Sequence, residues 1–306
     1  MTPVGAALEA VEARLRAVVG DVRRDEPLAR HVQFRIGGPA DLFVVPRTLA
    51  ELEAACGVLA AAGVRPVVLG QGSNVLVGDR GIRGVVVKVG KGCDRVAIDG
   101  TAVIAEAGAG LPALALQTAR RGLAGLEFGA GIPGSVGGAV VMNAGAHGHA
   151  MDEVTEWVEV LTPSGLRRLA REALGFAYRT SLLQEEPWVV ARAGLRLRVE
   201  PAAQVQARLE AWLAQRGVTQ PLGPPSSGCV FRNPPGDHAG RLIDAVGGKG
   251  LAVGGARVSE LHANYILNTG TATAAEVLAL ADLVRARVRE RAGIALEMEV
   301  KLLGEF

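Results

Sequence analysis

The sequence of 306 residues has few cysteines, few aromatic residues and no long apolar run. Its three cysteines, Cys56, Cys93 and Cys229, are too few for a disulfide framework, and their spacing does not suit a zinc site. We therefore expect a reducing, cytoplasmic environment. Because no apolar run reaches about 18 residues, we expect no transmembrane helix. The net charge of +2 gives no reason to expect a nucleic-acid or membrane partner.

Two familiar nucleotide-binding motifs are also absent. No stretch matches G-x-x-x-x-G-K-[S/T], which argues against a P-loop NTPase. Gly70 and Gly72 form a G-x-G, but the third glycine of the dinucleotide fingerprint is missing and strand-like residues follow. His147 and His149 have no acidic residue or cysteine at ligand spacing, so we expect no metal site.

Two glycine-rich loops stand where those motifs are missing. Residues 129–138 contain five glycines, one proline and one serine, and the small residues from Gly137 to Val141 could begin a helix. Glycine lets the backbone approach a ligand closely, and a helix start presents free N–H groups to an anion. A second loop, residues 70–74, follows a short apolar strand pattern at 67–69. The two loops could hold one dinucleotide from both sides, although either could instead be a tight connection.

The apolar periodicity predicts an α+β fold in which helices and strands alternate. We expect helices at 4–19, 48–62, 111–121, 204–215, 238–246 and 273–290. We expect strands at 40–45, 67–69, 85–89, 96–98, 102–107, 156–161, 188–199 and 296–302. A change of element at Pro201 places a domain boundary at about 196–202.

Three motifs occur in the order that is typical of one enzyme family. The stretch 31–40, which contains Gly37-Gly38-Pro39, precedes the loop at 70–77 and the glycine-rich segment at 129–145. From about residue 27 to residue 304 the sequence resembles the UDP-N-acetylenolpyruvoylglucosamine reductases, the MurB family. Val32 and Gln33 depart from the threonine that is usual in that family. With Tyr178 and Tyr265 as its only tyrosines, the chain resembles the shorter type that lacks a tyrosine-bearing loop.

The resemblance implies a fold, a reaction and partners. It implies an FAD-binding domain of the vanillyl-alcohol-oxidase (PCMH) type at 20–196 and a smaller αβ substrate domain at 197–306. It further implies a UDP-N-acetylmuramate dehydrogenase, in which FAD, bound non-covalently, mediates NADPH-dependent reduction of UDP-N-acetylglucosamine enolpyruvate to UDP-N-acetylmuramate. That reaction belongs to peptidoglycan precursor synthesis, and hence to cell wall biogenesis, cell shape, cell division and the cell cycle. The expected partners are the UDP-sugar and NADPH, and the expected state is a monomer.

Hydride addition to an enolpyruvyl double bond needs a cation for the carboxylate and a proton donor for the other carbon. Arg179 lies in Tyr-Arg-Thr-Ser, which matches the family's Y-R-x-S motif, and is the candidate cation. Cys229 takes the place of the proton-donating serine in a family motif Gly-Ser-x-Phe-Lys-Asn-Pro, and Arg232 takes the place of its lysine. A thiol, with a pKa of about 8.5, can donate a proton. Ser226 and Ser227 are alternative donors.

The third candidate is a carboxylate near the C-terminus. Glu299 matches the family's Leu-x-x-Glu-Val pattern and would assist protonation and orient the substrate carboxylate. Glu297 lies on the same face of the predicted strand by period-two alternation, so it is an alternative. Two rival functions also remain open: an oxidase on the same flavin fold, and a nucleotide-binding module without chemistry.

The resemblance also implies ligand-binding positions. For the UDP-sugar these are Tyr178, Arg232, Asn233 and His262. For FAD they are Ile36, Gly37, Gly70, Ser73, Asn74, Val75, Gly131, Pro133, Gly134, Ser135, Gly137, Gly138, Asn143 and Gly145.

Overall fold

The computed structural model describes residues 3–306, with side chains from residue 8 onward. The chain forms two compact units. The first unit contains residues up to 24, 42–71 and 84–214, and the second unit contains 25–41, 72–83 and 215–306. Because the chain passes between the units more than once, their boundary is not one cut in the sequence. The assignment of flavin binding to 20–196 and of substrate binding to 197–306 stays a prediction.

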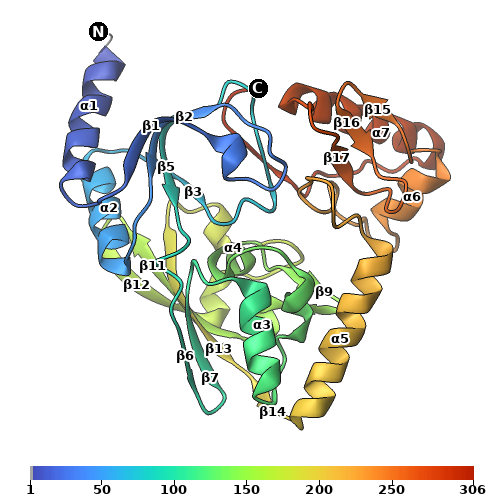
Figure 1. Cartoon of the computed structure of the whole chain (residues 1–306), viewed down its shortest axis with the longest axis horizontal. Coiled ribbons are helices and arrows are strands. Elements are labelled where there is room, and N and C mark those ends of the chain that lie inside the picture. Colours follow the sequence, from blue (N-terminus) through green and yellow to red (C-terminus); the bar gives the residue numbers. More distant parts are fainter. Residues whose placement is uncertain (1–2) are drawn as a thin grey trace. The chain divides into compact units, whose positions relative to one another are not determined.

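Two main sheets supply the strands of the first unit (Figure 1). The strand order of the smaller sheet is β1 (Val22–Pro27), β2 (Pro39–Val44), β5 (Ile82–Lys88) and β3 (Val67–Leu69). Three of these strands have one end in a segment of the second unit. The larger sheet is antiparallel, in the order β12 (Gly165–Ala170), β11 (Thr155–Thr162), β13 (Val189–Arg196), β7 (Ala102–Glu106) and β6 (Val96–Asp99). Two short pairs join β8 (Leu123–Ala124) to β14 (Arg198–Val199), and β9 (Gly145–Ala146) to β10 (His149–Ala150).

Side-chain caps start two helices of the first unit, α2 and α4. The hydroxyl of Thr48 accepts a hydrogen bond from Glu51 N at 3.1 Å, which starts α2 as predicted. The α-helices are α1 (Pro3–Arg16), α2 (Leu49–Ala61), α3 (Leu111–Arg120), α4 (Val136–Val141) and α5 (Ala202–Thr219), whose last turns continue into the second unit. The 3-10 helices are η2 (Glu127–Gly131), η3 (Met151–Glu153), η4 (Arg171–Leu174) and η5 (Leu182–Gln184). Helix α4 packs against β13 and β7, so the glycine-rich segment is held over the larger sheet.

The second unit has its own apolar core. An antiparallel sheet of β15 (Ala252–Val253), β16 (Ala256–Val258) and β17 (Ile266–Asn268) packs against α7 (Ala274–Ala292). Thr273 and Glu276 form a capping box that starts α7, and Gly293, with φ +70°, ends it. The remaining elements are η1 (Leu28–Arg30), α6 (Ala239–Ala245) and the parallel pair of β4 (Val75–Val77) with β18 (Lys301–Leu303).

Most predicted elements are confirmed to within a few residues, but two predicted strands are partly wrong. The strand predicted at 188–199 divides at Leu197, because the chain leaves its pairing with β7 and then pairs with β8. Of the strand predicted at 296–302, the structure forms only Lys301–Leu303. The residues before it bond to a different segment, since Arg232 N donates to Glu297 O at 2.9 Å. Glu297 and Glu299 therefore do not alternate along a regular strand.

Candidate functional site

The two glycine-rich loops touch within the first unit. Strand β3 ends at Leu69, and a Cβ at the next residue, Gly70, would lie 2.5 Å from the side-chain oxygen of Ser135. That distance leaves no room for a side chain at Gly70. Sequence reasoning expected the loops to act together, and this contact confirms that they lie side by side.

The segment 134–138 is fixed by main-chain hydrogen bonds to the start of α3 and to the residues between β7 and α3. Leu111 N donates to Gly134 O at 3.0 Å, and Gly137 N donates to Ala107 O at 2.9 Å. A Cβ at Gly137 would lie 2.7 Å from Ala107 Cβ. Ser135 then caps α4 by accepting a hydrogen bond from Gly138 N at 3.4 Å. The predicted helix start after the glycine loop is therefore confirmed, and the N–H groups of its first residues are paired within the protein, since Val136 N also donates to Ala109 O at 2.8 Å.

In the second unit, the predicted flavin residues Gly37 and Asn74, and the neighbouring Gly72, pack closely against other segments. Gly72 has φ +66°, and a Cβ there would lie 2.6 Å from the carbonyl oxygen of His31. Gly37 is equally close to Val77, at 2.7 Å from that side chain's Cβ. The side-chain amide of Asn74 donates to Glu299 O at 3.3 Å. A predicted flavin residue and a predicted catalytic residue are thus directly linked.

Arg179 lies beside two further predicted flavin residues in the first unit. Its guanidinium donates to Gly145 O at 2.9 Å and lies 5.3 Å from the centre of the Tyr178 ring. The amide of Asn143, a residue that is 4% exposed, donates to Ala177 O at 3.0 Å. Asn143 and Arg179 both have positive φ, at 41° and 55°. A positive φ costs conformational energy in residues other than glycine, and residues with such strain are often found at functional sites.

Cys229 and Glu299, 70 residues apart in the sequence, belong to adjacent backbone segments of the second unit. Val230 O accepts a hydrogen bond from Glu299 N at 2.8 Å, and Phe231 pairs with Met298 in an isolated bridge. Both Cys229 and Glu299 are half-buried, whereas Glu297 is exposed. The structure therefore places the thiol-bearing segment and the carboxylate-bearing segment next to each other.

The alternative proton donors differ in their surroundings. Ser226 is half-buried. Ser227 is 3% exposed, and its hydroxyl has no hydrogen-bond partner among the described residues. An unsatisfied buried hydroxyl carries a desolvation cost, so Ser227 stays an alternative to Cys229.

Tyr265 is a neighbour of Cys229 that sequence reasoning missed. The two residues form an antiparallel bridge, and directly opposite residues share a face. Tyr265 is 4% exposed and donates its hydroxyl hydrogen to Gln220 Oε1 at 2.6 Å. Burial raises the pKa of Tyr265 well above its ordinary value, and the nearby Cys229 adds to the rise. The only feature of the sequence that could have drawn attention to Tyr265 is that tyrosine is rare in this chain, which has two.

The predicted substrate residues of the second unit lie near this segment. His262 packs edge-on against Tyr265, with ring centres 4.9 Å apart, and burial lowers the pKa of His262. Asn233 accepts a hydrogen bond from Ala239 N at 3.0 Å, at the start of α6. Arg232 is half-buried and directly follows the Phe231 bridge. The convergence of these residues with Arg179 stays a prediction.

Comparisons with known proteins decide the family. The family model for the UDP-N-acetylenolpyruvoylglucosamine reductase C-terminal domain matches residues 220–303, and that for an FAD binding domain matches 40–169. UDP-N-acetylenolpyruvoylglucosamine reductase of Heliobacterium modesticaldum is 48% identical over 288 residues, which are 94% of this chain and 92% of that protein. The chain belongs to this family, the MurB family.

Further relatives agree with the MurB assignment. UDP-N-acetylenolpyruvoylglucosamine reductase of Bacillus subtilis is 43% identical and is matched over 94% of this chain and 95% of its own length. The crystal structure of MurB from Thermus caldophilus has a TM-score of 0.80 at 37% identity, covering 92% of this chain and 98% of that chain. The expected FAD-binding fold of the PCMH type, followed by a MurB C-terminal domain, is confirmed.

The loops fit the FAD that this MurB fold implies. Gly70 and Gly138 both lie next to the hydroxyl of Ser135, so a ligand could approach the backbone closely where the two loops meet. Among residues 3–306, no three or more His, Cys, Asp or Glu side chains are grouped so that they could hold a metal ion. Within the same range, every helix is too short or too polar to cross a lipid bilayer.

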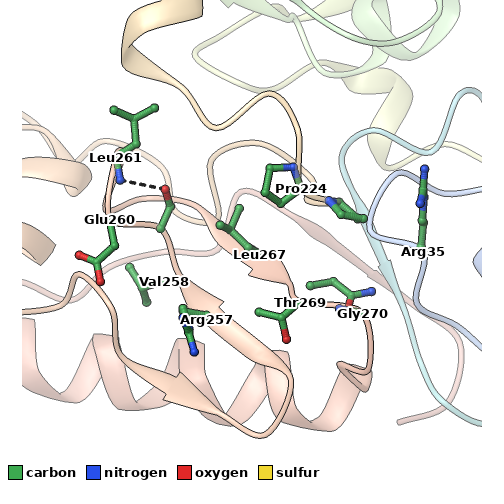
Figure 2. Close-up of a pocket in the computed structure, with 12 residues that line it drawn as sticks. Arg35, Pro224, Arg257, Val258, Glu260, Leu261, Leu267, Thr269 and Gly270 are labelled. Carbon is green, nitrogen blue, oxygen red and sulfur yellow. Dashed lines mark hydrogen bonds between the residues drawn. The ribbon is translucent and has the colours of Figure 1, made fainter.

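A separate hollow of about 640 Å³ lies in the second unit. Figure 2 shows Pro224 and Leu267 in the middle of the view, Arg257 and Thr269 below them, and Arg35 on the right. It opens beside the face of β16 and β17 that carries Arg257 and Leu267. None of the predicted catalytic, flavin or substrate residues is among the residues that line it.

Proposed function

We propose that this protein reduces the enolpyruvyl group of UDP-N-acetylglucosamine enolpyruvate, using NADPH and FAD, to form UDP-N-acetylmuramate. The relatives that carry the reductase name match most of the chain at 42–48% identity. The observation that carries the proposal is the pairing of the Cys229 segment with the Glu299 segment within the MurB C-terminal region. A nucleotide-binding module without chemistry would have no use for that pairing.

FAD, when bound, would take a hydride from NADPH and pass it to the enolpyruvyl double bond. The chain's own task at the cofactor is to bind and orient it. The loops at 70–74 and 129–138 would hold the diphosphate through main-chain groups, with Ser135 as the side chain between them. Asn143 and Gly145 would contact the part of FAD that lies nearest to Arg179, because Arg179 donates to Gly145 O.

At the substrate, we assign three roles. The Arg179 guanidinium would bind the enolpyruvyl carboxylate and stabilise the charge that builds on it. The Cys229 thiol would give its proton to the carbon that does not receive the hydride, becoming a thiolate that is reprotonated before the next turnover. Glu299 would orient the substrate carboxylate and assist that proton transfer. Tyr178, Arg232, Asn233 and His262 would bind the rest of the UDP-sugar.

We further propose that the protein acts as a monomer in the cytoplasm. Cys56, Cys93 and Cys229 form no disulfide with one another, which suits a reducing compartment in which NADPH is available. The product would serve peptidoglycan precursor synthesis.

A rapid-mixing experiment tests the proposal in two half-reactions. The FAD-loaded protein is mixed anaerobically with NADPH, and we expect the flavin absorbance to disappear. A second mixing with UDP-N-acetylglucosamine enolpyruvate should restore that absorbance without oxygen. Reoxidation by oxygen but not by the UDP-sugar would instead identify an oxidase on the same fold.

A further inference from the structure

Lys88 contacts the glycine-rich loop at 70–74 from the sheet beneath it. It is the last residue of β5, and its ammonium donates to Gly70 O at 2.5 Å. In the parallel pairing of β3 with β5, Lys88 is opposite Leu69, the residue that precedes the loop. The side chain is half-buried, and burial lowers the pKa of Lys88 to about 8. The chain has only four lysines, and this one lies against the cofactor loop.

The hydrogen bond determines how the peptide between Gly70 and Gln71 is turned. A trans peptide places its C=O and N–H on opposite sides. Because the Gly70 carbonyl is directed to Lys88, the N–H of Gln71 is directed away from β5. An anion on that side meets a donor and is spared the repulsion of a carbonyl oxygen.

The same peptide adjoins the glycine-rich loop at 129–138. The Cα of Gly70 lies against the hydroxyl of Ser135, which in turn accepts from Gly138 N at the start of α4. Lys88, Gly70 and Ser135 therefore form a continuous row from the sheet to the glycine-rich segment. A positive charge at the base of this row would favour a ligand with two negative phosphates, since a half-buried charge is weakly screened.

We propose that Lys88 is a positioning residue for FAD, which holds the Gly70–Gln71 peptide in its anion-binding orientation and supplies positive charge beneath the diphosphate. The proposal rests on FAD binding by the proposed reductase. It adds a cation to a set of predicted flavin residues in which no side chain is charged.

The test measures the dissociation constant of FAD for the apoprotein by the change in flavin fluorescence, at low and high salt. We expect Lys88→Met to weaken binding roughly 10- to 100-fold, as for the loss of a charge-assisted hydrogen bond. Lys88→Arg keeps the charge and should bind within roughly threefold of the wild-type protein. The dissociation constant of Lys88→Met should also depend less on salt.

Lys91→Met is the matched control, because Lys91 is exposed and lies three residues further along the chain. It should bind FAD as the wild-type protein does. If Lys88→Met does not fold, Lys88→Gln takes its place, since glutamine keeps a donor but has no charge. Wild-type affinity in the neutral variant would overturn the proposal, and so would an equal loss in Lys88→Arg. Failure of the wild-type apoprotein to bind FAD would instead contradict the proposed function.

Discussion

In the proposed reaction, Cys229 would take the role that the family motif gives to a serine. A thiol ionises near pH 8.5, far below a serine hydroxyl, so it gives up a proton more readily. Its half-buried position beside Tyr265 leaves it partly accessible. Glu299 reaches the same region through one main-chain hydrogen bond to Val230. A thiol and a carboxylate therefore lie on neighbouring backbone segments.

Cys229→Ala should separate the two half-reactions. We expect the variant to be reduced by NADPH at close to the wild-type rate, because the thiol has no part in that step. Oxidation by the UDP-sugar should slow by roughly 10²-fold or more, as for loss of a general acid. Rapid mixing with each partner in turn gives both rates.

Cys229→Ser is the matched control, since it restores the residue that the family motif has at this position. It should recover part of the second rate. Near wild-type oxidation of the alanine variant would show that another group, such as Ser226 or Ser227, donates the proton.

Candidate site residues could be chosen from the sequence only where the neighbouring residues form a recognisable motif. Cys229 and Glu299 were chosen by their flanking residues, and the structure brings their segments together. Lys88 and Tyr265 have no such flanking signal. The contact of Lys88 with Gly70 depends on the register of β3 with β5, and that of Tyr265 depends on a bridge formed across the fold. Register is set by non-local pairing, so a single sequence does not reveal it.

At the scale of elements, a partly buried ion pair joins η2 to α5. Glu127 is 4% exposed and is the first residue of η2, which leads into the glycine-rich loop. Its carboxylate accepts from Arg208 Nε at 2.8 Å and from Gly125 N at 2.5 Å. Burial by itself would raise the pKa of Glu127, but these hydrogen bonds and one from its own backbone lower it below its usual value. The contact holds the base of the loop against helix α5.

Glu127→Gln should destabilise the protein by about 1–3 kcal/mol at pH 7, since it removes a charged acceptor from Arg208. The lowered pKa means that the wild-type carboxylate contributes stability above its unfolded pKa of about 4.3. That contribution is lost as the pH falls through the folded pKa. The stability difference between variant and wild type should therefore shrink below about pH 4. Denaturant unfolding at several pH values measures it.

Glu210→Gln is the control for this prediction, because Glu210 is exposed on the same helix. It should change stability by less than about 0.5 kcal/mol at any pH. A pH-independent loss in Glu127→Gln would contradict the assignment of that loss to the ionised carboxylate.

At the scale of the whole molecule, two apolar cores stabilise two units. The residues predicted to bind FAD come from both units, with Ile36, Gly37 and residues 73–75 in the second and the others in the first. A ligand that binds only the folded protein stabilises it by mass action.

FAD at about 100 times its dissociation constant should add about 2.7 kcal/mol to the free energy of unfolding. We expect thermal unfolding of the apoprotein, followed by circular dichroism, to shift upward by several degrees. Riboflavin at the same concentration is the control, because it lacks the diphosphate and should give a smaller shift. An equal shift with both flavins would contradict a binding site centred on the diphosphate loops.

The sequence by itself determined the features that depend on neighbouring residues. Glycine at positions of positive φ such as Gly72, the cap at Thr48 and the capping box at Thr273 follow from local conformational preferences. The helices and most strands follow from apolar periodicity.

Only the tertiary structure decided which segments meet. It divided the predicted terminal strand, because residues 296–300 bond to the Cys229 segment before Lys301–Leu303 pairs with β4. It also brought Gly70 against Ser135 and placed Lys88 beneath that loop. These contacts join residues far apart in sequence, and their geometry depends on the packing of the whole unit around them.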